Sequence, residues 1–142
     1  MKKNEFVLFL GPMFSGKTSR LLNALDRFHY MKQKTILFKP KMDNRYAIDK
    51  VTSHTGHEMN AINITSGKDL ISYLEKAEID YDVIAVDEAF MIDNISESLI
   101  RLFRLGKTII VSSLEMTASC NPCEEINDMI TWATRIEKCT SI

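Results

Sequence analysis

Short apolar runs alternate along the whole chain with segments that are apolar on one side only. The run at residues 6–10 is wholly apolar, which is typical of a strand buried on both faces of a sheet. Comparable short runs predict further strands at residues 35–38, 83–86 and 108–111. Residues 61–64 alternate weakly and predict a short strand, and residues 136–142 are either a last strand or a frayed end.

Between these runs, apolar residues recur at a spacing of three to four positions, as on the buried face of a helix. Three helices follow from this spacing, and their apolar positions are Leu21, Leu22, Leu25 and Phe28; Leu70, Ile71 and Leu74; and Ile95, Leu99, Ile100 and Phe103. A last helix is predicted after residues 121–124, where an Asn, a Pro and a Glu stand in the order of a helix start.

Boundary residues support these elements. Ser66 followed by Asp69 resembles a capping box at a helix start, and Gly106 is placed to end the third helix. Pro40 is expected to stop the second strand, and the polar residues 41–50 are expected to form a long loop. Strands interleaved with helices predict a single α/β domain over residues 1–142, with a mainly parallel sheet and a ligand site at its C-terminal edge.

Composition excludes several classes of protein. The 142 residues are 45% hydrophobic and carry a net charge of -1, so a disordered chain or a broad basic nucleic-acid surface is not expected. The longest apolar run is too short to span a membrane or to act as a signal peptide. The three cysteines, Cys120, Cys123 and Cys139, do not form a regular disulfide pattern. These features predict a cytoplasmic protein that binds neither nucleic acid nor membrane.

The strongest motif follows the first predicted strand and matches G-x-x-x-x-G-K-[ST] in full. Its residues are Gly11, Pro12, Met13, Phe14, Ser15, Gly16, Lys17 and Thr18. Between a buried strand and an amphipathic helix, this loop directs backbone N–H groups and a helix N-terminus at one anion. Lys17 is expected to reach the β- and γ-phosphates of a nucleotide, and Thr18 to ligate Mg²⁺. The alternative is a glycine-bearing turn with an exposed lysine.

A second motif ends the strand at residues 83–86, where Asp87 and Glu88 follow a buried run. This is the form of a Walker B strand. Asp87 is expected to hold Mg²⁺ directly or through water, and Glu88 to act as general base on an attacking hydroxyl or water. The alternative is a solvated strand end.

The cysteine motif at residues 120–123 is open to several interpretations. Its C-x-P-C pattern suits a redox thiol at a helix start, and a zinc site would need two more ligands, such as His54 and His57. Incidental cysteines are the favoured interpretation. The methionines are interpreted as core or pocket fillers.

Taken together, the motifs resemble the type II, zinc-containing thymidine kinases of cells and viruses. The resemblance covers nearly the whole chain. Beyond the P-loop it includes Phe38-Lys39-Pro40, Asp43-Asn44-Arg45-Tyr46, Ser53-His54-x-Gly56, Ala61-Ile62 and Asp87-Glu88-Ala89. It implies a RecA-like P-loop sheet flanked by helices, a homotetramer, and Mg²⁺-dependent transfer of the ATP γ-phosphate to the 5′-hydroxyl of thymidine. Glu88 inherits the role of the base.

The chain departs from the family pattern on the side of the phosphate acceptor. Where the family has D-E-A-Q-F-F, this chain has Phe90, Met91 and Ile92 after Ala89, and Thr55 replaces an acid. The residues at positions that resemble the nucleoside pocket are Met13, Phe90, Met91, Ala118 and Cys123. The family places its zinc ligands and lasso loop after the position of Ile142, so zinc is not expected within residues 1–142. Weak recognition of thymine is expected from the missing aromatic faces.

These observations predict a deoxynucleoside kinase of the thymidine kinase type, with ATP as donor and Mg²⁺ as cofactor. Two alternatives remain open. One is a nucleotide-binding relative whose acceptor is lost or changed, and the other is a P-loop ATPase in which Glu88 activates water.

Overall fold

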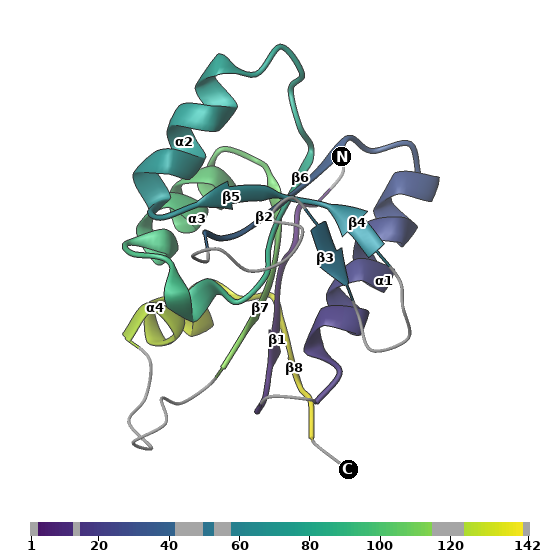
Figure 1. The fold of residues 1–142 in the computed structure, drawn as a ribbon, viewed down its shortest axis with the longest axis vertical. Helices are drawn as coiled ribbons and strands as arrows, with labels where there is room; N and C mark the ends of the chain where they lie inside the picture. The colour runs from purple at the N-terminus through teal and green to yellow at the C-terminus, as the bar shows by residue number, and fades with distance from the viewer. Residues whose placement is uncertain (1–2, 13–14, 42–49, 53–57, 115–123, 141–142) are drawn as a thin grey trace.

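A central sheet of six parallel strands organises the chain, as the computed structural model shows for residues 3–12, 15–41, 50–52, 58–114 and 124–140 (Figure 1). The strands run in the order β5-β2-β6-β7-β1-β8, and every pairing between them is parallel. Their bounds are β1 (Phe6–Leu10), β2 (Thr35–Pro40), β5 (Ile62–Ile64), β6 (Val83–Val86), β7 (Thr108–Ser113) and β8 (Arg135–Lys138). The predicted parallel α/β sheet is therefore confirmed.

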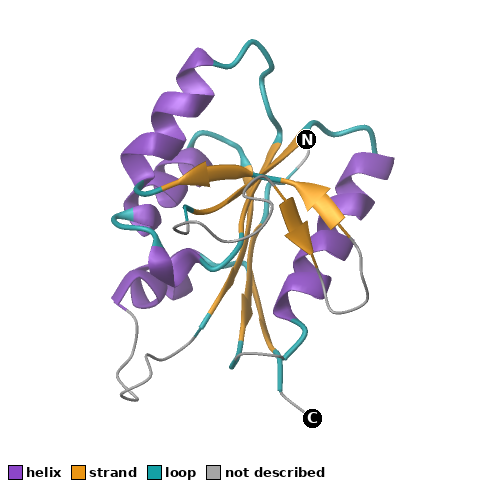
Figure 2. Cartoon of the chain, viewed as in Figure 1, coloured by secondary structure: helices purple, strands orange, loops and turns teal. Residues whose placement is uncertain are grey.

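Helices cover both faces of this sheet (Figure 2). Helix α1 (Lys17–Tyr30) packs on one face, and α2 (Gly67–Lys76), α3 (Ile95–Arg104) and α4 (Glu124–Trp132) cover the other. Two buried clusters correspond to these two layers, one containing Leu21 and Leu25 of α1 and the other containing Leu70 and Leu99 of α2 and α3. Because both faces are covered, the inner strands β1 and β6 are apolar and buried at every position, as their sequences indicated.

Strand β7 lies between β1 and β6, although it follows both in the sequence. All three strands are parallel, so their C-terminal ends meet at the same edge of the sheet. The loop after β1 and the acids after β6 therefore face one another across the end of β7. This is the position at which open α/β sheets bind ligands.

The sequence predicted that the second strand would stop at Pro40. This prediction is wrong, because β2 includes Pro40. Phe38 accepts a hydrogen bond from Asp87 N at 2.9 Å, so Phe38 and Pro40, two residues apart, face the β6 side of β2. Strand β6 ends at Val86, so the N–H group that proline lacks has no strand to pair with there. On the other side of β2, Lys41 N donates to Ile64 O at 2.9 Å and continues the pairing with β5.

A small antiparallel pair, β3 (Lys50–Thr52) and β4 (Glu58–Asn60), was not predicted from the sequence. Its Val51 and Met59 pack with the cluster around α1. The predicted loop 41–50 thus ends in a strand at Lys50, and residues 42–49 lie outside the described part of the chain. Each strand has only three residues, so the alternation of apolar and polar side chains is too short to predict a strand from the sequence.

The predicted helix boundaries at α2 and α3 are confirmed. Ser66 accepts a hydrogen bond from Asp69 N at 3.3 Å, and Asp69 in turn accepts from Thr65 N at 2.9 Å. Gly106 follows α3 with a φ of 101°, the left-handed conformation common just after a helix. The fourth predicted helix is present as α4, which begins at Glu124. Residues 121–123, which were predicted to start it, lie outside the described residues.

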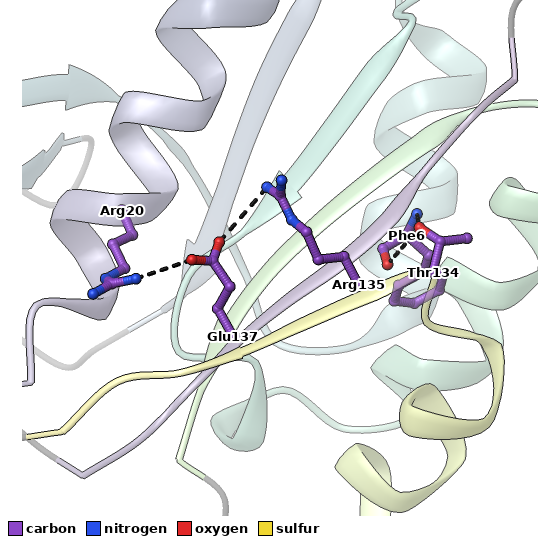
Figure 3. A network of polar contacts seen from close by, with 5 residues as sticks. All are labelled: Phe6, Arg20, Thr134, Arg135 and Glu137. Carbon is purple, nitrogen blue, oxygen red and sulfur yellow. Dashed lines mark hydrogen bonds and ion pairs between the residues drawn. The ribbon is translucent and has the colours of Figure 1, made fainter.

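The last strand, β8, runs over Arg135–Lys138 rather than over 136–142, and Figure 3 shows how it is fastened. Thr134 Oγ1 accepts from Phe6 N at 2.9 Å and holds the start of β8 to β1. Glu137 forms ion pairs with Arg20 of α1 at 3.0 Å and with Arg135 at 3.7 Å. These contacts link β8 to α1, the helix that follows the loop 11–16.

Candidate active site

The loop from β1 to α1 depends on its glycines. A Cβ atom at Gly11 would collide with the backbone carbonyl of Cys139, so only glycine allows the loop to pass the end of β8 this closely. Gly16 has a φ of 82°, a left-handed conformation that side chains disfavour, and it directly precedes the first turn of α1. Met13 and Phe14 lie outside the described residues. Both described glycines therefore serve the geometry of the loop.

Lys17, the first residue of α1, folds back over this loop. Its Nζ donates a hydrogen bond to Pro12 O at 2.8 Å. Burial lowers the pKa of Lys17, while the nearby charges of Asp87 and Glu88 oppose that shift. The lysine thus lies within the electrostatic reach of both acids.

Thr18, Asp87 and Ser112 form a hydrogen-bonded group at the ends of three elements. Thr18 Oγ1 donates to Asp87 Oδ1 at 3.2 Å and lies 3.5 Å from Oδ2. Ser112 Oγ also donates to Asp87 Oδ1. The first turn of α1 and the ends of β6 and β7 therefore meet at one carboxylate.

Asp87 is a buried acid, with 7% of its surface exposed. Burial raises its pKa, and the hydrogen bonds from Ser112 and Thr18 oppose this rise. A buried carboxylate is costly unless hydrogen bonds or cations compensate it. The two hydroxyls and nearby Lys17 supply that compensation here.

Glu88 adopts a left-handed backbone conformation, with φ 50° and ψ 48°. Such a conformation is uncommon for a residue other than glycine and is found preferentially at functional sites. Burial raises the pKa of the partly buried Glu88 carboxyl, as does repulsion from Asp87, and the charges of Lys17 and Lys39 oppose the rise. The site thus holds two acids with different surroundings.

The residues around this loop fit a phosphate group and a magnesium ion. The buried hydroxyl of Ser15 has no hydrogen-bond partner among the described residues, and it lies in the loop expected to bind phosphate. Thr18 and Asp87 present only oxygen atoms, the donors that Mg²⁺ prefers. Both observations suit a nucleotide bound with its metal.

The residues predicted to line a nucleoside pocket are only partly described. Phe90 and Met91 lie in a short 3₁₀ turn, Ala89–Met91, that follows Glu88. Met91 is 43% exposed, whereas Phe90 packs against the larger core cluster. Met13, Ala118 and Cys123 lie outside the described residues. Of the predicted set, Met91 is the described side chain most open to a ligand.

The cysteine motif at residues 120–123, His54 and His57 also lie outside the described residues. Within the described ranges, no group of three or more His, Cys, Asp or Glu side chains is arranged to hold a metal. Cys139 is a buried free thiol at the end of β8, and burial raises its pKa. No helix in the same ranges has the length and apolarity required to cross a membrane.

Sequence reasoning missed Ser112, which contacts both acids. A weak signal was present, because two serines follow the apolar residues 109–111 at the edge of the sheet where the acids also lie. Nothing in the sequence indicated that β7 lies beside β6 and β1. The sequence therefore did not predict a function for the serines at the end of this strand.

A P-loop after β1 and a buried acid after β6, at one edge of a parallel sheet, define a P-loop nucleotide-binding protein. The solved structure of the flagellar accessory protein FlaH from Methanocaldococcus jannaschii shares this fold, with a TM-score of 0.63 and 14% sequence identity. The alignment covers 97% of this chain and 72% of FlaH. This similarity supports the RecA-like arrangement of the sheet.

The family model described as thymidine kinase matches residues 4–142. A thymidine kinase of Pseudothermotoga lettingae is 34% identical over 135 residues, which cover 94% of this chain and 71% of that protein. A thymidine kinase of Pyrobaculum aerophilum is 33% identical over 131 residues, 92% of this chain and 70% of that protein. The chain belongs to the thymidine kinase family.

Proposed function

We propose that this protein is a thymidine kinase that transfers the γ-phosphate of ATP to the 5′-hydroxyl of thymidine. The observation that carries the proposal is the contact of Thr18 with Asp87 at 3.2 Å, which joins the P-loop helix to the acidic strand end. Membership of the thymidine kinase family supports the choice of acceptor.

In this proposal the loop 11–18 binds the phosphates of ATP. Lys17 would leave the carbonyl of Pro12 and contact the β- and γ-phosphates instead. The N–H groups of the loop and the N-terminus of α1 add partial positive charge at the same place. The unpartnered hydroxyl of Ser15 would gain a phosphate oxygen as its partner.

Thr18 and Asp87 would hold Mg²⁺, which neutralises charge on the phosphates when it is bound. Asp87 must be ionised for this role, although burial raises its pKa. The hydroxyls of Thr18 and Ser112 favour the ionised form because they donate to it.

Glu88 would accept the proton of the 5′-hydroxyl as this oxygen attacks the γ-phosphate. Its pKa is raised by burial and by Asp87, which makes it a better base than an exposed glutamate. The left-handed backbone at Glu88 interrupts the extended conformation of β6, which ends at Val86. The Glu88 side chain therefore does not follow the alternation of side chains along that strand. This supports a role distinct from that of Asp87.

For the nucleoside we propose a pocket that includes Met13, Phe90, Met91, Ala118 and Cys123. Met91 is exposed beside the acids, in the turn that follows Glu88. We further propose a cytoplasmic homotetramer, on the basis of the resemblance to the type II family. The partners of the protein are then its nucleoside and nucleotide substrates.

A panel of nucleosides with radiolabelled ATP tests the proposal. Thymidine should become labelled, faster than the other deoxynucleosides, and Glu88→Gln should abolish most of the labelling. Preferential labelling of another nucleoside would change the acceptor. Release of inorganic phosphate at the same rate without any nucleoside would contradict the kinase and favour an ATPase.

A further inference from the structure

Ser112 is completely buried at the end of β7, yet its side chain is polar. The register of the sheet pairs Val86 of β6 with Val111 of β7. The residues that come next along the chain, Asp87 directly after β6 and Ser112 within β7, therefore become neighbours at the edge of the sheet. This places a hydroxyl group beside a buried carboxylate.

The Ser112 hydroxyl uses both of its hydrogen-bonding functions on the two acids. It donates its hydrogen to Asp87 Oδ1. It also accepts the backbone N–H of Glu88 at 3.3 Å. One side chain is thus bonded to the side chain of the first acid and to the backbone of the second.

Both contacts bear on the orientation of these acids. Asp87 Oδ1 receives the hydroxyls of Ser112 and Thr18, and Oδ2 lies 3.5 Å from Thr18 Oγ1. Glu88 has a left-handed backbone, and the bond to its N–H stabilises the turn at the point where the chain leaves β6. Removing the hydroxyl would loosen both acids.

We propose that Ser112 is a positioning residue that orients Asp87 toward the bound metal–nucleotide and holds the backbone of Glu88. The inference rests on the proposed function, because it assumes the same metal–nucleotide site. Groups that orient a metal ligand typically change metal affinity by about 10- to 100-fold when they are removed. Ser112 should therefore affect metal binding more than nucleotide binding without metal.

The neighbouring Ser113 provides a matched control. It is equally buried on the same strand, and its hydroxyl donates to the carbonyl of Leu114 at 3.1 Å rather than to either acid. Ser112→Ala and Ser113→Ala delete the same atom from adjacent buried positions. They differ in whether the lost hydroxyl contacted Asp87.

The experiment measures binding of Mn²⁺ to the protein–ADP complex by electron paramagnetic resonance, and binding of ADP in EDTA by calorimetry. Ser112→Ala should weaken Mn²⁺ binding by about tenfold or more. Its affinity for ADP without metal should change less than twofold, by our estimate of about 0.4 kcal/mol or less. Ser113→Ala should leave both affinities close to those of the wild type.

Unchanged Mn²⁺ binding in folded Ser112→Ala would overturn the inference, as would an equal loss of metal-free ADP binding. Ser112→Cys, measured in parallel, replaces the hydroxyl with a slightly larger thiol that is a weaker donor, and should show the same direction of change. If Ser112→Ala fails to fold, unchanged Mn²⁺ binding in Ser112→Cys overturns the inference.

The proposed function and this inference fail in different ways. A wild-type protein that binds Mn²⁺–ADP but does not phosphorylate thymidine contradicts the function and leaves the result for Ser112 to stand. A wild-type protein that phosphorylates thymidine while Ser112→Ala binds Mn²⁺ normally contradicts only the inference. A wild-type protein that binds no Mn²⁺ with ADP overturns both.

Discussion

Lys17 Nζ donates a hydrogen bond to the carbonyl oxygen of Pro12, 2.8 Å away. The lysine is therefore hydrogen-bonded to the same loop with which it is expected to bind phosphate. Binding of a nucleotide would exchange this carbonyl for phosphate oxygens, which carry more negative charge. The gain of a charge-assisted contact should therefore appear in the affinity for ATP.

Lys17→Ala should weaken Mg²⁺–ATP binding by about tenfold or more, because a hydrogen bond to a charged group contributes roughly 1.5 to 3 kcal/mol. Titration calorimetry gives the affinity. Lys76→Ala, which removes an exposed lysine in the last turn of α2, is the control. An unchanged affinity in folded Lys17→Ala would remove Lys17 from the phosphate site.

Glu88→Gln should lower kcat by about 10²- to 10⁴-fold, the usual contribution of a general base, while the affinity for ATP barely changes. Steady-state kinetics combined with calorimetry separates these two effects. Near wild-type turnover in the variant would exclude Glu88 as the base.

The rate of the wild-type enzyme should fall on the acidic side as Glu88 becomes protonated. Burial and Asp87 raise the pKa of Glu88 above its ordinary value of 4.5, so the loss should begin at a higher pH than for an exposed glutamate. A protonated carboxyl cannot accept the proton of the hydroxyl, which sets the sign of the effect. A profile of kcat against pH at saturating Mg²⁺–ATP, recorded for the wild type and for Glu88→Gln, should show the limb that is due to Glu88 in the wild type alone.

Met91→Phe should lower the KM for thymidine. Met91 is 43% exposed in the turn after Glu88, and an aromatic face that stacks on a base contributes about 1 to 3 kcal/mol, or roughly fivefold or more. Met31→Phe is the control, since Met31 is 54% exposed just after the last turn of α1. A KM that does not change, or that rises, would argue against a nucleoside pocket at Met91.

Ser66→Ala should reduce the free energy of unfolding by about 1 kcal/mol, because it removes the acceptor for Asp69 N at the start of α2. Urea denaturation measures the change. Ser72→Ala, at an exposed position within the same helix, should be neutral or slightly stabilising. Equal losses in both variants would show that the cap contributes nothing specific.

The local parts of the fold and site were predictable because their causes lie within a few consecutive residues. Residues 6–18 combine a buried strand, two glycines and a helix start in one segment, so the motif could be recognised from consecutive residues. The acids at 87 and 88 follow a run of apolar residues, which identifies a strand end. Ser66 and Asp69 likewise cap a helix within four residues.

Other features depend on which strands become neighbours. The extension of β2 through Pro40 requires β6 to end at Val86, and the three-residue strands of β3 and β4 are stabilised by packing against the layer of α1. Neither condition can be recognised from residues close in sequence, because β6 follows β2 by tens of residues and the α1 residues in the cluster with Val51 and Met59 precede them by tens of residues.

The sequence alone therefore determined the class of site: a P-loop motif after the first strand, and two adjacent acids at the end of another buried strand. Only the tertiary structure decided that β7 lies between β1 and β6 and brings Ser112 to both acids. The physical reason is that hydrogen bonds between strand ends depend on strand order and register. A motif carries local backbone preferences, but order and register result from the packing of the whole sheet.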